Sequence, residues 1–454
     1  MRALVVLLAA ALLLPAAALA QAPDYGPVEV IPNPQSGVIG LAAAWTTNPA
    51  GTFALTWSAQ GRNSDGYVFG ARSPLAVGTP PATLLGPARQ KSGFGSLPPA
   101  IGFRTSGSVV VASRSSAPAR LGATAGATTN RLPAPRTLAF PGGSVNGAVL
   151  GMRSDGGTVI AVSICSARCT RRTISLVTRS NTGWLGAPVA LTGSGAARTV
   201  AIAVNARGDA FTVWVRGKQV QGRLRTGGGS VGPVVNFGPA QYSFAPLAVT
   251  ITPRRRVVVA WENQTVHEGS TVSSDATFSV AVSQDGRSFT HATMLETQTD
   301  RIRTPGRAIV ATLASDDTTW LAWSIRSSGH FVVRAARVTS TGPQGATTLS
   351  TATTADAAIS SIAGGPDHRV AAVWSETPTG SEAEDAAVVA AVRPHGSWDP
   401  PETVAAGTRV FPDEQFPVVT IDETSGIALF AWTQSTGGAG TSGEQVALRT
   451  RAIP

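Results

Sequence analysis

The chain has 454 residues, of which 43% are hydrophobic, so its composition excludes a disordered protein. Its 49 glycines and 31 prolines indicate frequent turns between short strands, and long helices are not expected. The formal charge of +10 suits an anionic partner, but the basic residues are nearly all arginines scattered without a recognised motif, so specific nucleic-acid binding is not expected.

The N-terminus has the pattern of a secretory signal peptide. Arg2 precedes an apolar run from Ala3 to Leu14, and Ala18, Leu19 and Ala20 form a small-x-small cleavage site. We therefore expect a signal peptide over residues 1–20 and one domain over residues 21–454. The apolar run is too short to span a bilayer, which takes about 20 residues, and no later segment reaches that length. The predicted location is outside the cell, either free or associated with the cell wall.

A strand ending in Val/Ala-Trp, or in a substitute for it, recurs through the mature chain. The eight occurrences end at Trp57, Ser113, Ser163, Trp214, Trp261, Trp323, Trp374 and Trp432. Spacings of 47 to 62 residues are too long for one hairpin and fit a four-stranded blade. The predicted fold is a single closed all-β propeller.

The two chain ends complement each other. The last repeat stops after its third strand at Arg451, whereas the segment from Pro27 to Ile31 resembles the fourth strands of other repeats. We expect the N-terminal strand to complete the last blade, which would close a ring of eight blades and remove two exposed edges. Seven blades remain an alternative, because the first two repeats are irregular.

Cys165 and Cys169 are the only cysteines. In an exported protein they are expected to form a disulfide that clamps one hairpin loop. Metal binding by the two thiolates is the weaker alternative, since no His or further Cys lies near them, and the five histidines show no metal-ligand spacing. No metal or cofactor is predicted.

In these Trp-bearing repeats the chain resembles bacterial secreted β-propellers. The segment from Ser283 to Phe289, with Asp285 and Gly286, also resembles an Asp-box, a turn found in sialidases and in many non-enzymatic propellers. The resemblance implies that Asp285 accepts backbone hydrogen bonds and has a structural role. A sialidase would further need an arginine triad, an acid and a tyrosine nucleophile, and no such set can be singled out.

The tryptophans of the repeat are expected to fill the space between neighbouring sheets, as large core side chains do. Trp184, Phe289 and Trp398 recur just before a fourth strand and are expected to pack similarly. Trp45 and Trp320 lie off the pattern, which makes them ligand candidates.

Long loops after the Trp strands share one face of a propeller with the connections between blades. Binding residues concentrate on such loops, and we hypothesise a polar ligand surface there. Its candidate residues are Glu262, His267, Glu268, Arg301, Arg303 and Arg409. Solvated loop charge is the alternative interpretation.

The function predicted from these features is a secreted, non-catalytic binding or scaffold module. Its partner would be an extracellular glycan, a wall polymer or a protein. A sialidase-like or other glycoside-processing enzyme is an alternative, with carboxylates drawn from Glu262, Glu376, Asp413 and Glu414. A protein–protein interaction hub is another.

Overall fold

Alternating side chains and closely spaced turns produce short strands of 2 to 11 residues along the whole chain. A computed structural model of the protein describes residues 25–26, 28–31, 38–45, 52–59, 65–72, 90–91, 100–104, 108–115, 120–127, 133, 135–141, 143–166, 169–193, 195, 197–241, 245–267, 273–300, 309–379, 386–406, 417–422, 424–435 and 444–454.

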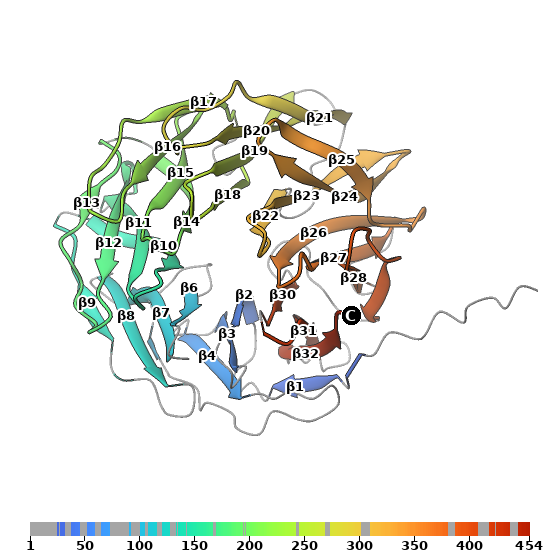
Figure 1. The fold of residues 1–454 in the computed structure, drawn as a ribbon, viewed down its shortest axis with the longest axis horizontal. Coiled ribbons are helices and arrows are strands. Elements are labelled where there is room, and N and C mark those ends of the chain that lie inside the picture. The colour runs from blue at the N-terminus through green and yellow to red at the C-terminus, as the bar shows by residue number, and fades with distance from the viewer. Residues whose placement is uncertain are drawn as a thin grey trace, which may run out of the picture.

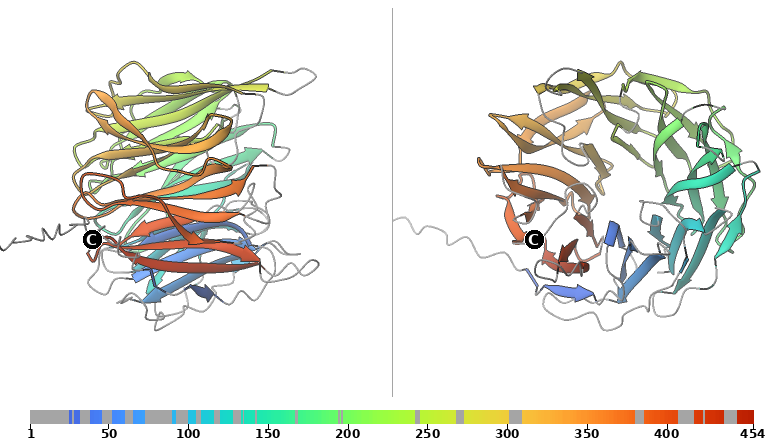
Figure 2. Two further views of the ribbon diagram at one scale, coloured as in Figure 1. Left: turned by 90° about the vertical axis from the view of Figure 1, so that its right-hand side faces the viewer. Right: turned by 180° about the vertical axis from the view of Figure 1, so that it is seen from behind.

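The described strands form eight four-stranded antiparallel sheets arranged in a ring, which is the predicted all-β propeller (Figure 1). In each sheet the strand nearest the centre comes first in its repeat and the others follow outward. The sheets stand face to face around the ring (Figure 2). We number them as blades 1 to 8 in the order of their inner strands.

Blades 1 to 4 occupy the first half of the ring. Blade 1 contains β2 (Val38–Trp45), β3 (Thr52–Ala59), β4 (Asp65–Arg72) and β5 (Gln90–Lys91). Blade 2 contains β6 (Ala100–Phe103), β7 (Ser108–Ser115), β8 (Arg120–Ala127) and β9 (Arg136–Leu138). Blade 3 contains β10 (Gly143–Met152), β11 (Thr158–Ser166), β12 (Arg172–Arg179) and β13 (Val189–Ala190). Blade 4 contains β14 (Ala197–Val204), β15 (Ala210–Arg216), β16 (Gln219–Arg225) and β17 (Val235–Pro239).

Blades 5 to 8 complete the ring. Blade 5 contains β18 (Leu247–Ile251), β19 (Val257–His267), β20 (Ser273–Ser283) and β21 (Thr293–Asp300). Blade 6 contains β22 (Ile309–Leu313), β23 (Thr319–Ser327), β24 (His330–Thr339) and β25 (Gly342–Thr348). Blade 7 contains β26 (Ala355–Gly364), β27 (Val370–Pro378), β28 (Ala387–Arg393) and β29 (Glu402–Ala405). Blade 8 contains β30 (Val418–Ile421), β31 (Ile427–Ser435), β32 (Glu444–Ala452) and β1 (Glu29–Ile31).

The N-terminal strand completes the last blade, as predicted from the chain ends. Strand β1 pairs antiparallel with β32, with Val30 opposite Ala447. Just before it, the Gly26 N–H donates to the Thr450 carbonyl at 2.9 Å, and the ring of Tyr25 packs 6.1 Å from that of Phe430. The first and last described strands therefore hold the ring closed.

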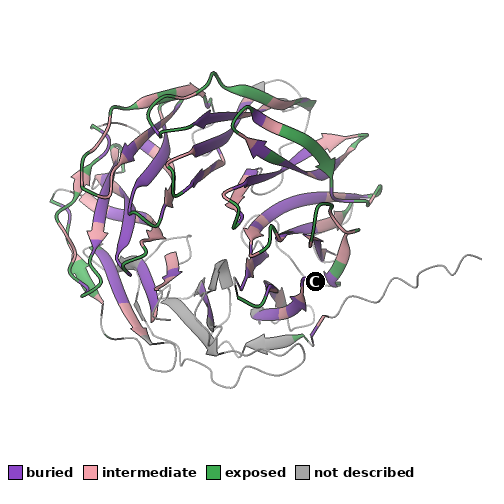
Figure 3. Ribbon diagram, viewed as in Figure 1, coloured by how far each residue is buried: buried purple, intermediate pink, exposed green. Residues whose placement is uncertain are grey.

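The described tryptophans of the repeat lie between blades, as expected, and the side chain of Trp57 lies outside the described residues. Trp214, Trp261, Trp323, Trp374 and Trp432 are each at most 1% exposed. Trp261 packs with Phe211 and Val213 of the preceding blade, and the other four repeat this arrangement. In Figure 3 the buried residues of the middle strands are purple in blades 3 to 8. An indole in this position supplies a large part of each interface in which it is described.

Two aromatic predictions are wrong, and neighbouring side chains explain both. Trp320 is 8% exposed and lies edge-on to Trp398, 5.7 Å away, so it belongs to the core and is not a ligand candidate. Trp184 is 68% exposed, although it was expected to pack like Trp398. The backbone bonds of the two turns make Leu185 the counterpart of Trp398 in blade 3, and Leu185 packs on the core while Trp184, one residue earlier, is left outside it. The side chain of Trp45 lies outside the described residues.

The turn at Asp285 has the hydrogen bonds predicted for it. The carboxylate accepts the N–H groups of Ser288 at 2.9 Å and Arg287 at 2.8 Å, and the Ser283 hydroxyl accepts the Gly286 N–H at 2.8 Å. These backbone donors, that of Ser288 foremost, lower the pKa of Asp285. Its role in this structure is to fix the β20–β21 connection.

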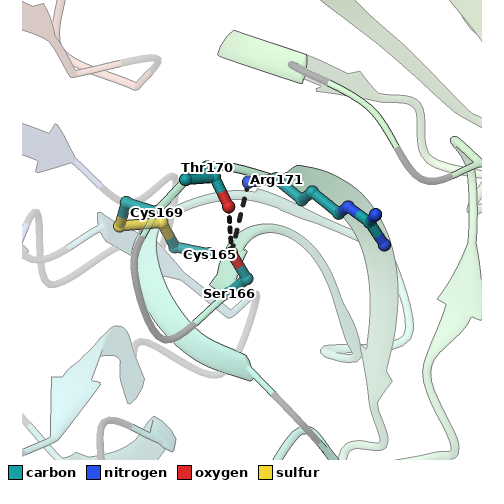
Figure 4. The surroundings of a disulfide bond; sticks show 5 residues. All are labelled: Cys165, Ser166, Cys169, Thr170 and Arg171. Carbon is teal, nitrogen blue, oxygen red and sulfur yellow. Dashed lines mark hydrogen bonds between the residues drawn. A yellow bond between two sulfur atoms is a disulfide. The ribbon is translucent and has the colours of Figure 1, made fainter.

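A disulfide joins Cys165 near the end of β11 to Cys169, with the Cα atoms 4.9 Å apart (Figure 4). The Ser166 hydroxyl accepts the Arg171 N–H at 3.2 Å and lies 3.4 Å from the Thr170 hydroxyl. The bond therefore lies across the β11–β12 hairpin loop, where the sequence places it.

Turns between the first and second strands of successive blades are joined to one another. The Ser154 hydroxyl donates to the Ala206 carbonyl at 2.6 Å, and the Asn205 amide donates to the Thr252 carbonyl at 3.0 Å. The buried carboxylate of Asp209 pairs with Arg255 of the next blade at 2.8 Å. These contacts make one edge of the ring a rigid platform. In the described part of the chain, no helix is long and apolar enough to cross a membrane.

Candidate anion-binding site

The residues proposed from the sequence as a ligand surface are only partly described. Glu262 is on β19 and is 3% exposed, so it lies inside the blade, and His267 is the last residue of β19. Glu268, Arg301, Arg303 and Arg409 lie outside the described residues, so that surface remains a prediction.

The carboxylates suggested for an enzyme are likewise not assembled among the described residues. Glu376 accepts the indole N–H of Trp374 at 2.8 Å, and burial raises its pKa. Asp413 and Glu414 lie outside the described residues. No group of three or more His, Cys, Asp or Glu side chains in the described ranges is placed to hold a metal ion.

Charge is divided sharply between the two halves of the ring. Residues 66–261, which include most of blades 1 to 4, carry 22 Lys and Arg but only two acidic residues, Asp155 and Asp209. Residues 262–454 carry 12 basic and 21 acidic residues. Acidic residues are therefore nearly absent from one stretch of the chain, and that half of the ring has a strong excess of positive charge.

Arg179 is the most buried cation of this basic half. It ends β12, and only 6% of the residue is exposed. Its Nη1 lies 3.5 Å from the Ser180 carbonyl, and its Nε is buried without a hydrogen-bond partner among the described residues. A guanidinium removed from water without an acid beside it is costly, because its charge and donors are left uncompensated.

Two more arginines from blade 2 face Arg179. Arg104 directly follows the inner strand β6, and Arg136 begins the outer strand β9. First and third strands of a sheet run in the same direction, and the fourth strand begins at the edge where the third ends. The positions of Arg104, Arg136 and Arg179 therefore meet at one edge of the ring. Burial first, and then the charges of Arg104 and Arg136, lower the pKa of Arg179 to about 10. Burial also lowers the pKa of Arg104, whose Nε and Nη2 have no partner in the described structure.

Glycines leave room for these guanidinium groups. Gly183 has a φ of +93°, and a Cβ there would lie 3.1 Å from Arg179 Nη2 and 4.0 Å from Arg136 Nε. A side chain there would crowd the Arg179 guanidinium and strain the turn, whose backbone is left-handed at this residue.

Trp184 adds an exposed aromatic surface next to the arginines. The Arg136 guanidinium lies 4.6 Å from the centre of its ring, a cation–π distance. Among the described residues it is the only aromatic side chain that is both large and exposed. Three cations and one open indole thus share the edge between blades 2 and 3.

Arginines at the same strand position in other blades have hydrogen-bond or ion-pair partners that give them a structural role. The antiparallel register places Arg179 opposite Thr158, and it places Arg393 and Arg451 in the corresponding positions of blades 7 and 8. Arg451 pairs with Glu402 at 2.8 Å and Asp399 at 3.7 Å. Arg393 donates to the carbonyls of His368 and Gly396 and stacks on Trp320. Arg179 lacks such carboxylate partners among the described residues.

None of Arg104, Arg136, Arg179 and Trp184 was selected as a binding residue from the sequence. They come from separate strands and turns, so no local motif contains them. The shortage of acidic residues between positions 66 and 261 is the signal that could have directed attention to this half of the ring.

No protein-family model matches the chain, and no curated protein does. Solved structures with similarity to it include the polysaccharide lyase Uly1, at 10% identity and a TM-score of 0.48, covering 89% of this chain and 88% of that one. An ulvan lyase has 11% identity and a TM-score of 0.47, with coverage of 92% and 95%. An α-L-arabinanase of Penicillium chrysogenum has 10% identity and a TM-score of 0.42, with coverage of 95% and 97%. These likenesses establish no activity or ligand for this chain.

Proposed function

We propose that the chain is a secreted, non-catalytic binding module for an acidic polysaccharide. Arg104, Arg136 and Arg179 would bind a carboxylate or sulfate group of the ligand, and Trp184 would stack on a sugar ring. The observation that carries the proposal is the buried Arg179 guanidinium, whose Nε has no hydrogen-bond partner among the described residues and which is repelled by the charges of Arg104 and Arg136.

A bound anion would supply what this cluster lacks. Guanidinium groups donate pairs of hydrogen bonds to the oxygens of carboxylates and sulfates, and bonds between charged groups are stronger than neutral ones. A negative charge among Arg104, Arg136 and Arg179 would also relieve their mutual repulsion. The joined turns of blades 3 to 5 hold this edge of the ring together, and a site on a fixed scaffold loses less entropy on binding.

The indole next to the cations favours a saccharide over other polyanions. The flat apolar face of Trp184 suits the apolar face of a sugar ring, and 68% of the residue is exposed. Single-stranded nucleic acids are usually held by several stacking aromatics in succession. The described residues of this edge offer one such platform, and the predicted export of the chain places it where acidic polysaccharides occur.

The first test measures binding of residues 21–454 to polygalacturonate, dextran sulfate, neutral dextran and single-stranded DNA at two salt concentrations. We expect binding to one or both acidic polysaccharides that persists at the higher salt, and none to neutral dextran. Arg179→Gln should weaken this binding by about 1.5–3 kcal/mol, the contribution of a hydrogen bond to a charged group.

Arg287→Gln is the matched control, because it removes one positive charge from an exposed turn at the same edge in blade 5. Equal losses in both variants would mean that only net charge matters, and the proposed site would be wrong. Tighter binding to DNA than to either acidic polysaccharide would also overturn the proposal.

A further inference from the structure

We infer that the anion site is repeated on the next blade, around Arg153 and Arg225, and that the ligand is therefore a linear polyanion lying across both positions. This inference rests on the proposed function and adds to it the length of the ligand and a second binding subsite.

The register of the sheets makes Arg225 the counterpart of Arg179. Arg225 ends β16 and pairs with Ala210, the first residue of β15, just as Arg179 ends β12 and pairs with Thr158, the first residue of β11. Both third strands thus present an arginine at the same edge of the ring, in adjacent blades.

Arg153 is in turn the counterpart of Arg104. The Arg104 N–H donates to the Ser108 carbonyl at 2.9 Å, and the Arg153 N–H donates to the Gly157 carbonyl at 2.9 Å, so both residues open the turn after an inner strand. Arg104 of blade 2 faces Arg179 of blade 3, and Arg153 of blade 3 faces Arg225 of blade 4. The unit of two arginines from consecutive blades therefore occurs twice in succession.

The two units also share their electrostatic features. Burial, and then the charge of Arg153, lowers the pKa of Arg225, as burial and the charge of Arg104 do for Arg179. The Nε atoms of Arg153 and Arg225 are buried and have no hydrogen-bond partner among the described residues. Both positions thus retain donors for an anion.

The turn after each arginine has the same construction. The Gly183 N–H donates to the Ser180 carbonyl at 3.0 Å, and the Gly229 N–H donates to the Thr226 carbonyl at 2.9 Å. A Cβ on Gly183 would lie 3.1 Å from Arg179 Nη2, and one on Gly229 would lie 3.8 Å from Arg225 Nη2. A glycine thus stands four residues after the arginine and beside its guanidinium in both blades.

The two subsites differ in strength. Asp155 pairs with Arg153 at 2.8 Å, so the second subsite has one carboxylate beside its two cations. The position of Trp184 is occupied in the second turn by Ser230. The Trp184 carbonyl accepts the N–H of Ser180, the first residue of its turn, and the Ser230 carbonyl accepts the N–H of Thr226 in the same way. We therefore expect the first subsite to hold a sugar by charge and stacking, and the second to add charge alone.

Blades 7 and 8 do not repeat the unit. In blade 6, which precedes the blade of Arg393, the position of Arg104 and Arg153 is occupied by Ala314. In blade 7, which precedes the blade of Arg451, it is occupied by Gly365. Their third-strand arginines are satisfied by carbonyls, an indole or carboxylates. Among the described blades, the arginine pairs belong to the basic half of the ring.

The experiment compares wild type, Arg179→Gln, Arg225→Gln and Arg287→Gln against size-fractionated acidic oligosaccharides, using whichever class binds the wild type. A ligand that reaches both subsites gains affinity through effective concentration, because the second contact is intramolecular. We expect wild-type affinity to rise at least tenfold from disaccharide to long oligosaccharide. Arg225→Gln should abolish most of that rise while leaving disaccharide affinity within twofold of wild type.

The outcomes separate the two proposals. If Arg179→Gln weakens binding but Arg225→Gln follows wild type at every length, the site is single and this inference is wrong, while the proposed function stands. If neither variant differs from Arg287→Gln, both proposals fail. Circular dichroism melting of each variant checks the fold, and a loss of disaccharide binding in Arg225→Gln with unchanged melting would also contradict the assigned subsites.

Discussion

Single residues at equivalent positions of this propeller have opposite roles, depending on what the neighbouring blade offers. Arg451 is neutralised by two carboxylates, whereas Arg179 faces two further arginines. Trp398 is packed against Trp320, whereas Trp184, one residue before the position equivalent to Trp398, is exposed next to Arg136. A repeat position that stabilises one blade is therefore free to bind a ligand in another.

The tryptophan pair gives a prediction at this scale. Trp184→Ala should leave the melting temperature nearly unchanged, because its indole is mostly in water, but it should weaken polysaccharide binding. Trp398→Ala should lower the free energy of unfolding by about 3 kcal/mol, the usual cost of truncating a packed aromatic, with little effect on binding. Thermal denaturation and binding of the two variants, measured side by side, check this contrast. A large loss of stability in Trp184→Ala would show that the indole is structural.

Elements of the ring are coupled through their turns as well as through the apolar interfaces. Asp209 accepts the N–H of Gly227 within its own blade at 2.9 Å and pairs with Arg255 of the next blade. Burial by itself would raise the pKa of Asp209, but hydrogen bonds from Arg255, Gly227 and Asn205, with the charge of Arg255, outweigh it and lower the pKa. The ionised carboxylate is thus a link between blades 4 and 5.

This link should make stability depend on pH. Because the folded pKa lies below the unfolded value of about 3.9, Asp209 stabilises the fold fully above that value and loses its contribution as pH falls through the folded pKa. We expect Asp209→Asn to cost about 1–3 kcal/mol at pH 7. The difference from wild type should shrink in urea denaturation below pH 3.5. A constant difference down to pH 2 would mean that the ionisation of Asp209 is irrelevant.

At the scale of the whole molecule, the sequence predicts those features that follow from local periodicity. Alternation, turns and the recurring Trp strand identify the blades, and the incomplete last repeat identifies β1 as its missing strand. The exposure of Trp184 could not be predicted, because the turn of blade 3 is one residue longer than that of blade 7 and puts Leu185 at the core position. The cluster of Arg104, Arg136 and Arg179 needs the register of two sheets and their packing, which no single segment encodes.

Closure of the ring supplies the last prediction. Removing residues 27–32 would delete β1 and leave β32 as an unpaired edge, while Tyr25 would lose the position from which it packs on Phe430. Tyr25 packs against the core of the last blades, and burial raises the pKa of its phenol to about 12. We expect the deletion to lower the melting temperature markedly and to promote self-association through the exposed edge.

Melting curves and light scattering measure both effects, and replacement of residues 29–31 by three threonines is the control, because it keeps the backbone pairing. A deletion variant that melts like wild type and stays monomeric would show that the ring does not depend on strand exchange between its ends.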